Sequence, residues 1–461
     1  MQKLFHTKSI DDMLASRHDL KRTLHAKDLV FLGIGAIIGA GIFVITGVAA
    51  AKYAGPAIML SFVLAGIACG LAALCYSELT AMIPISGSAY SYAYATMGEL
   101  VAWIIGWDLV LEYAMSASTV AIGWSGYFTS LLGGLGIHLP KMLTASLFMA
   151  EGGFINLPAA LVVGALTYVL IIGIRESASA NNIMVLVKVA MVVLFILAGM
   201  GSVKASNWTP FMPFGFSGMM TGAGVIFFAY IGFDAVSTAA QEAINPETDV
   251  PKGIITSLAI CTVLYLLTAA VLTGMISYKE LNVPAPIAAA LHHIGQGDLA
   301  FIIEVGALIG MTSVILVLLL GQSRVFYTMG RDGLLPPWAS EVHAEYKTPH
   351  VSTLTVGAAV ALVAAFVPLN VLSELVSLGT LFAFGVVCGG VLLLRRSRPD
   401  LERPFHCPGV PYVPVAGMAA CAYLMFNLPF TTWLLFVVWM AAGLGVYFKY
   451  SIHHSEMRKP G

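Results

Sequence analysis

Charged side chains are scarce in this chain: Asp, Glu, Lys and Arg make up 10% of its 461 residues, against about 25% in soluble domains. Hydrophobic residues account for 59%, and the mean hydropathy is +0.88. This composition excludes a water-soluble globular protein. It predicts an all-α integral membrane protein, because a helix satisfies its backbone hydrogen bonds internally, where lipid offers no partner.

Enzyme and metal signatures are also missing. The six cysteines are scattered without metal-ligand spacing, and the chain has neither an HExxH nor a Walker motif. The segment Gly123–Tyr127 departs from the GxSxG nucleophile elbow at its fifth position. We therefore expect no enzymatic activity, no catalytic residues, no metal, no cofactor and no nucleic-acid partner. Protein partners are not indicated.

Long apolar stretches dominate the sequence instead. About 20 apolar residues suffice to cross a bilayer, and twelve stretches qualify. They lie at roughly 28–54, 57–83, 98–131, 157–174, 180–203, 217–243, 254–276, 297–329, 352–368, 371–394, 411–430 and 432–450. The polar segment 1–27 that precedes them is too long for the start of a cleavable signal peptide.

The distribution of basic residues predicts the orientation. If the N-terminus is cytoplasmic, most of the 23 Lys and Arg residues face the cytoplasm. Lys52, Lys141, Lys204 and Lys279 fall outside, and Lys188 lies within a span. Because cytoplasmic loops are enriched in Lys and Arg, we expect a multi-pass protein of the plasma membrane with both termini, including the tail 451–461, in the cytoplasm.

Two of the predicted spans are interrupted. The first contains four glycines between Gly33 and Gly41, and the sixth places Gly232 and Asp234 at membrane depth. Glycine weakens a helix by roughly 0.8–1 kcal/mol relative to alanine. Interruptions five spans apart predict an inverted repeat, with spans 28–203 mirrored by spans 217–394 and two extra helices at 411–450.

Broken helices at the membrane centre have a specific chemical use. Their half-helix N-termini attract an anion, and their freed carbonyls accept from a cation. An α-amino acid carries both charges on neighbouring atoms, so backbone alone can recognise its head group. Close helix packing is the alternative interpretation of the glycines, because Gly35 and Gly39 also fit the small-xxx-small pattern.

The segments Ile34–Phe43, Phe227–Ala239 and Asn245–Pro251 resemble the amino acid–polyamine–organocation transporters. The chain is most similar to the bacterial twelve-span members of the cationic amino acid transporter branch. The resemblance implies a LeuT-like fold of five plus five helices, with discontinuous helices 1 and 6. It also implies an L-amino acid as the small-molecule substrate, within a lipid bilayer.

The resemblance also implies positions for the substrate. Its carboxylate is expected near the N–H groups of Ala40 and Gly41, and its amino group near the carbonyls of Ile37, Phe228 and Ile231. The adjoining residues Ile38, Gly39 and Ala229 complete this binding segment. Phe228 resembles the aromatic gate on the outer side. Many relatives have Ser or Thr at position 40, so Ala40 offers only its backbone N–H.

Lys188 is the only basic residue of the fifth span. It lies about 10 Å of helix rise from Asn181, so a side chain that snorkels to the cytoplasmic surface is one interpretation. The other is a buried amine that binds and releases a proton. The resemblance favours the second, because similar members carry a lysine where sodium-coupled relatives bind sodium. The proton is then the coupling ion, and Lys188 is expected to connect spans one, five and eight.

Four acidic residues have candidate roles. Asp108 and Glu112 share a face of the third span at i, i+4; Glu112 is expected to line the pocket, bind a proton or pair with a hydroxyl, and Asp108 to be structural. Asp234 is a structural or proton-coupling candidate, with a helix N–H or a polar group of the first span as its partner. Glu78 is either part of an inner gate, paired with a basic residue, or a solvated helix end.

These features predict a secondary active transporter that imports L-amino acids by proton-coupled symport and alternating access. A sodium-coupled or exchange-type amino acid or polyamine transporter is the alternative. A channel is disfavoured, because it would need a wide polar path, whereas the polar groups here cluster at one site at the membrane centre. The substrate side chain stays open: a cationic one needs Glu112, whereas a small neutral or branched one needs only an apolar pocket.

Overall fold

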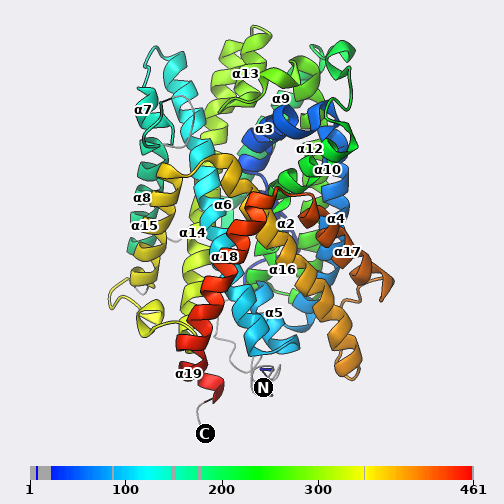
Figure 1. Ribbon diagram of the computed structural model, residues 1–461, viewed down its shortest axis with the longest axis vertical. Coiled ribbons are helices and arrows are strands. Elements are labelled where there is room, and N and C mark those ends of the chain that lie inside the picture. The colour runs from blue at the N-terminus through cyan, green and yellow to red at the C-terminus, as the bar shows by residue number, and fades with distance from the viewer. Residues whose placement is uncertain are drawn as a thin grey trace.

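The computed structural model describes residues 7–8, 22–85, 88–146, 152–173, 178–346 and 348–458, and throughout these residues it contains helices and no strand. Long helices run side by side along one axis of the molecule, with α13 (Pro286–His293) at one end and α5 (Ser88–Thr96) at the other (Figure 1). Neither of these two end helices was predicted from the sequence, because both lie between the apolar stretches. The chain is thus a helical bundle, as the composition predicts.

Within the described part of the chain, eight helical stretches are long and apolar enough to cross a membrane. The first, Ala26–Met82, covers two predicted spans, and three shorter apolar helices coincide with further predicted spans. The long helices after the first span are α4 (Ile58–Met82), α6 (Glu99–Gly134), α8 (Leu157–Ile172), α9 (Ala178–Met200), α12 (Pro246–Met275), α14 (Gly297–Arg331), α15 (His350–Phe366), α16 (Leu369–Ser397), α17 (Tyr412–Phe426) and α18 (Phe430–Val446). The count of twelve, the inverted repeat and the domain boundaries stay predictions.

The first span is interrupted where the glycine run predicts it. Helix α2 (Ala26–Ile37) ends at Ile38, whose backbone is extended at φ −74° and ψ 100°. The chain resumes as the π-helical segment η2 (Gly41–Ile45), followed by α3 (Thr46–Ala49) and a second π-helical segment, η3 (Ala50–Ala54).

The sixth span is interrupted as well. Helix α10 (Gly215–Ile226) tightens into the 3₁₀ segment η6 (Phe227–Tyr230) and gives way to extended backbone at Ile231. Helical structure returns in α11 (Ala235–Thr238). Gly232 lies between them with φ +113°, a conformation that side-chain-bearing residues rarely adopt.

The two interruptions lie against each other. A methyl group on Gly41 would collide with the backbone of Ala229, and one on Gly232 would lie 2.7 Å from the carbonyl oxygen of Ala36. The glycines therefore serve close packing and the break together, and the two interpretations of the run are not exclusive. Each broken segment brings its backbone into direct contact with the other.

The described residues nearest the two chain ends meet at one end of the bundle. The Lys8 ammonium lies 3.1 Å from Oδ1 of Asp332, and the Glu456 N–H donates to the Asp332 carbonyl. Residues 1–6 and 9–21 of the predicted N-terminal segment, and residues 459–461 of the predicted tail, lie outside the described residues.

Candidate functional site

The candidate site is built from the two interruptions. Ala40 and Gly41 begin the new helical segment, and the first N–H groups of a helix have no intrahelical acceptor. These amides and the helix dipole favour an anion at that point. All of the predicted contact residues are buried, and even Ile231 is only 7% exposed. The site is therefore closed to solvent in this structure.

The carbonyls predicted for the amino group have partners within the protein. The hydroxyl of Tyr265, on α12, donates to the Ile37 carbonyl at 2.8 Å. The Ile231 N–H donates to the Phe228 carbonyl at 3.2 Å. Because a carbonyl oxygen has two lone pairs, each of these groups retains the capacity to accept a second hydrogen bond from an ammonium group.

Lys188 lies inside the bundle. Its side chain is 0% exposed, and its Nζ donates a hydrogen bond to the Gly35 carbonyl of α2 at 2.8 Å. Its aliphatic stem packs on α14, where a methyl group on Gly310 would lie 3.0 Å from Cγ of Lys188. One side chain of α9 thus contacts both α2, at the start of the broken span, and α14. This geometry is not that of a side chain snorkelling to the surface.

Three further acidic residues, Asp108, Glu112 and Asp234, are buried. Asp234 accepts a hydrogen bond from Ser88 of α5 at 3.5 Å, and the backbone N–H groups of Gly232 and Ala235 also face its carboxylate. Of the two partners that the sequence suggested, these are the helix N–H groups rather than a polar group of the first span. Glu112 lies within electrostatic range of both Asp234 and Asp108, with the Thr380 hydroxyl of α16 beside it. Neither carboxylate oxygen of Asp108 has a hydrogen-bond partner among the described residues, so no contact supports a structural role for it.

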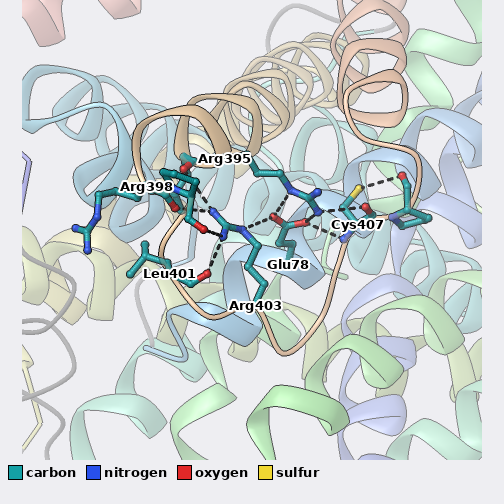
Figure 2. Close-up of polar contacts among 9 residues, drawn as sticks. Glu78, Arg395, Arg398, Leu401, Arg403 and Cys407 are labelled. Atoms are coloured by element: carbon teal, nitrogen blue, oxygen red, sulfur yellow. Dashed lines mark hydrogen bonds and ion pairs between the residues drawn. The ribbon is translucent and has the colours of Figure 1, made fainter.

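Glu78 lies apart from these residues, at the end of α4. The Arg395 guanidinium binds it in a bidentate manner at 2.9 and 2.6 Å, Arg403 approaches to 3.4 Å, and the Cys407 N–H donates to it at 2.7 Å (Figure 2). We refer to these four residues as the Glu78 cluster. Glu78 is 1% exposed, so it is not a solvated helix end, and the cluster joins α4 to the loop that follows α16.

Sequence reasoning missed several of these contacts. Tyr265 and Thr380 gave no signal, because a single hydroxyl in an apolar span is common and its partner is distant in the chain. Arg395 and Arg403 were counted only as positive charges that set the orientation. Their proximity to Glu78 depends on how α4 and α16 pack together.

The chain is similar in sequence to known permeases and transporters. Residues 24–449 match the model of the amino acid permease family. The chain is 50% identical to a branched-chain amino acid permease of Bacillus subtilis (strain 168), with 99% of each chain covered, and 49% identical to a methylthioribose transporter of the same organism, with 100% of each covered. It is 38% identical to the vacuolar cationic amino acid transporter 4 of Arabidopsis thaliana, over 87% of this chain and 68% of that protein. These relatives are transporters rather than enzymes, and the chain belongs to the amino acid permease family, whose members are multi-pass membrane proteins.

Proposed function

We propose that this permease imports L-amino acids by proton-coupled symport, with Lys188 as the group that couples the proton to the conformational change. The hydrogen bond from Lys188 to the Gly35 carbonyl carries the proposal. A charged ammonium at this point stabilises the carbonyl end of α2, as a cation does at a helix C-terminus. Loss of its proton removes that attraction. The position of α2 thereby responds to protonation.

The substrate is held at the crossing of the two interruptions. Its carboxylate binds the N–H groups of Ala40 and Gly41, and its ammonium binds the carbonyls of Ile37, Phe228 and Ile231. Phe228 closes the outer side of the site, and the Glu78 cluster closes the opposite end. This arrangement belongs to a fold of twelve spans with a five-plus-five inverted repeat and both termini in the cytoplasm.

We further propose that the preferred substrates are branched-chain L-amino acids. The support is the half-identical, full-length relative named for them, together with a central site whose predicted contact residues are all apolar or glycine, apart from Glu112. A branched aliphatic side chain gains from burial without needing a charged partner. A cationic substrate would require Glu112 to be ionised and within reach of the substrate side chain.

Purified protein in proteoliposomes tests both parts. Counterflow of leucine, isoleucine and valine should exceed that of arginine, lysine and methylthioribose. An inward pH gradient should drive accumulation without sodium. Saturable counterflow of arginine or methylthioribose alone would contradict the substrate proposal, and uptake that requires a sodium gradient and ignores pH would contradict proton coupling.

A further inference from the structure

One buried acidic side chain is left out of the proposed mechanism. Asp108 lies on α6 with 0% of its surface exposed, and both of its carboxylate oxygens lack a hydrogen-bond partner among the described residues. It faces α16, where a methyl group on Gly379 would lie 2.6 Å from Oδ1 of Asp108. The absence of a side chain at Gly379 is what allows α16 to cover the carboxyl group.

Other buried carboxyl groups of this chain have identifiable donors. Glu78 has two arginines, Glu99 has Arg458, Glu374 has the hydroxyls of Tyr53 and Thr432, Glu304 has Ser130 and Asp234 has Ser88. The Thr380 hydroxyl lies near Glu112, but it has no hydrogen-bond partner among the described residues. Asp108 differs from the five carboxyl groups that have donors, and its bare carboxyl group is therefore not explained by a structural hydrogen bond.

The groups around Asp108 supply no compensating charge. From α16 it faces Gly379, which has no titratable side chain. On α6 itself the nearest acid is Glu112, one helical turn away, and Asp234 and Tyr76 lie around Glu112.

Helices α14 and α5 also pack on this part of α6. Helix α14 presents Gln322, whose amide donates to the Val110 carbonyl, and α5 presents Tyr90 beside Gly106. No ammonium or guanidinium group is found to pair with Asp108 in the part of the chain that the structure describes.

Burial of an ionised carboxylate without a partner is strongly unfavourable, and such a group takes up a proton instead. Asp108 is accordingly a neutral carboxylic acid while α16 covers it. If α16 separated from α6, water would solvate the group and favour its ionised form. The same movement would disturb the Glu78 cluster, because Arg395 belongs to α16.

We propose that Asp108 is a second proton-binding site of the transport cycle, protonated when α6 and α16 are packed together and deprotonated to water when they separate. The O–H bond of the carboxylic acid breaks, the proton passes to water, and the electron pair stays on the carboxylate. Asp108 lies one turn, or about 6 Å, nearer than Glu112 to the end of α6 at which Glu99 binds Arg458. This inference rests on the proposed proton coupling.

The test compares wild-type protein with Asp108→Asn, which imitates the protonated carboxyl group in size and charge. Both are reconstituted at full length in proteoliposomes. Leucine counterflow, which needs no net proton movement, should stay within about twofold, whereas accumulation driven by a pH gradient should fall by about tenfold or more, a typical coupling factor. Asp400→Asn is the matched control, because Asp400 is an exposed carboxylate in the loop after α16; it should leave both activities unchanged.

Unchanged gradient-driven accumulation in Asp108→Asn would overturn the inference, and so would an equal loss of counterflow and accumulation in folded protein. Asp108→Ser, also neutral and smaller, replaces the first variant if that protein does not fold. Infrared difference spectra separate this inference from proton coupling itself. If wild-type protein ignores a pH gradient, the proposed function fails. The carbonyl band of a neutral carboxylic acid, present in wild-type protein and absent in Asp108→Asn, still shows whether Asp108 binds a proton, and its absence from wild-type protein overturns the inference.

Discussion

Replacement of Gly41 by alanine tests whether the crossing of the two interruptions binds the substrate. The added methyl group would overlap Cα and Cβ of Ala229. Because the main obstacle is backbone, no flexible side chain can move aside. Overpacking of this kind typically costs about 1–3 kcal/mol. If that strain falls on the closed, substrate-bound state, affinity falls by roughly 5- to 150-fold, at 1.4 kcal/mol for each factor of ten.

The assay is a thermal-shift titration with leucine, followed by counterflow. Gly41→Ala should require a correspondingly higher leucine concentration for the same stabilisation. Gly232→Ala should show the same defect, because it adds contact with the Ala36 carbonyl to a φ of +113°, a left-handed strain of roughly 1–2 kcal/mol.

Gly70→Ala is the matched control. Gly70 lies on α4, and a methyl group added to it would have no neighbouring side chain or other segment within 4 Å. Alanine also stabilises a helix interior by up to about 1 kcal/mol relative to glycine. This variant should bind leucine as the wild type does. Wild-type affinity and stability in Gly41→Ala would refute the proposal that the crossing forms the substrate site.

Three further predictions concern contacts outside the glycines. Tyr265→Phe removes the donor to the Ile37 carbonyl and should lower stability by about 1 kcal/mol, measured by thermal unfolding; an unchanged melting temperature would show that the hydrogen bond is not formed in the membrane. Glu78→Gln should loosen the Glu78 cluster by about 3–5 kcal/mol, as when one partner of a buried ion pair is removed, and transport should fall; normal transport would exclude a gating role. Contact with the Cys75 thiol and burial raise the pKa of Cys407 well above its ordinary value, so this thiol stays protonated at neutral pH and should react slowly with maleimide. Glu78→Gln should accelerate that labelling, and an equal labelling rate in the variant and the wild type would contradict the contact between Cys407 and Glu78.

The features that sequence predicted well are local ones. Glycines weaken a helix whatever the rest of the fold, and the structure interrupts the first and sixth spans at Gly33–Gly41 and near Gly232. The apolar stretches likewise predict helices, because the length and hydropathy of a span are properties of a single segment.

The contacts that sequence could not predict join distant segments. Ile37 and Tyr265 are 228 positions apart, and Glu78 and Arg395 are 317 apart. For Lys188, helix rise alone left two interpretations open, and only the packing of α2 and α14 around it distinguishes them. For Asp108, the sequence shows the neighbour at i+4 but not the glycine of α16 that covers it.

Proton-driven leucine accumulation by Lys188→Ala is the most direct measurement of the central claim. The variant is compared with wild-type protein and with Lys252→Ala, which removes an exposed lysine of α12. If Lys188 couples the proton to α2, accumulation under an inward pH gradient should be abolished in Lys188→Ala and preserved in Lys252→Ala. Full gradient-driven accumulation by Lys188→Ala would contradict the account.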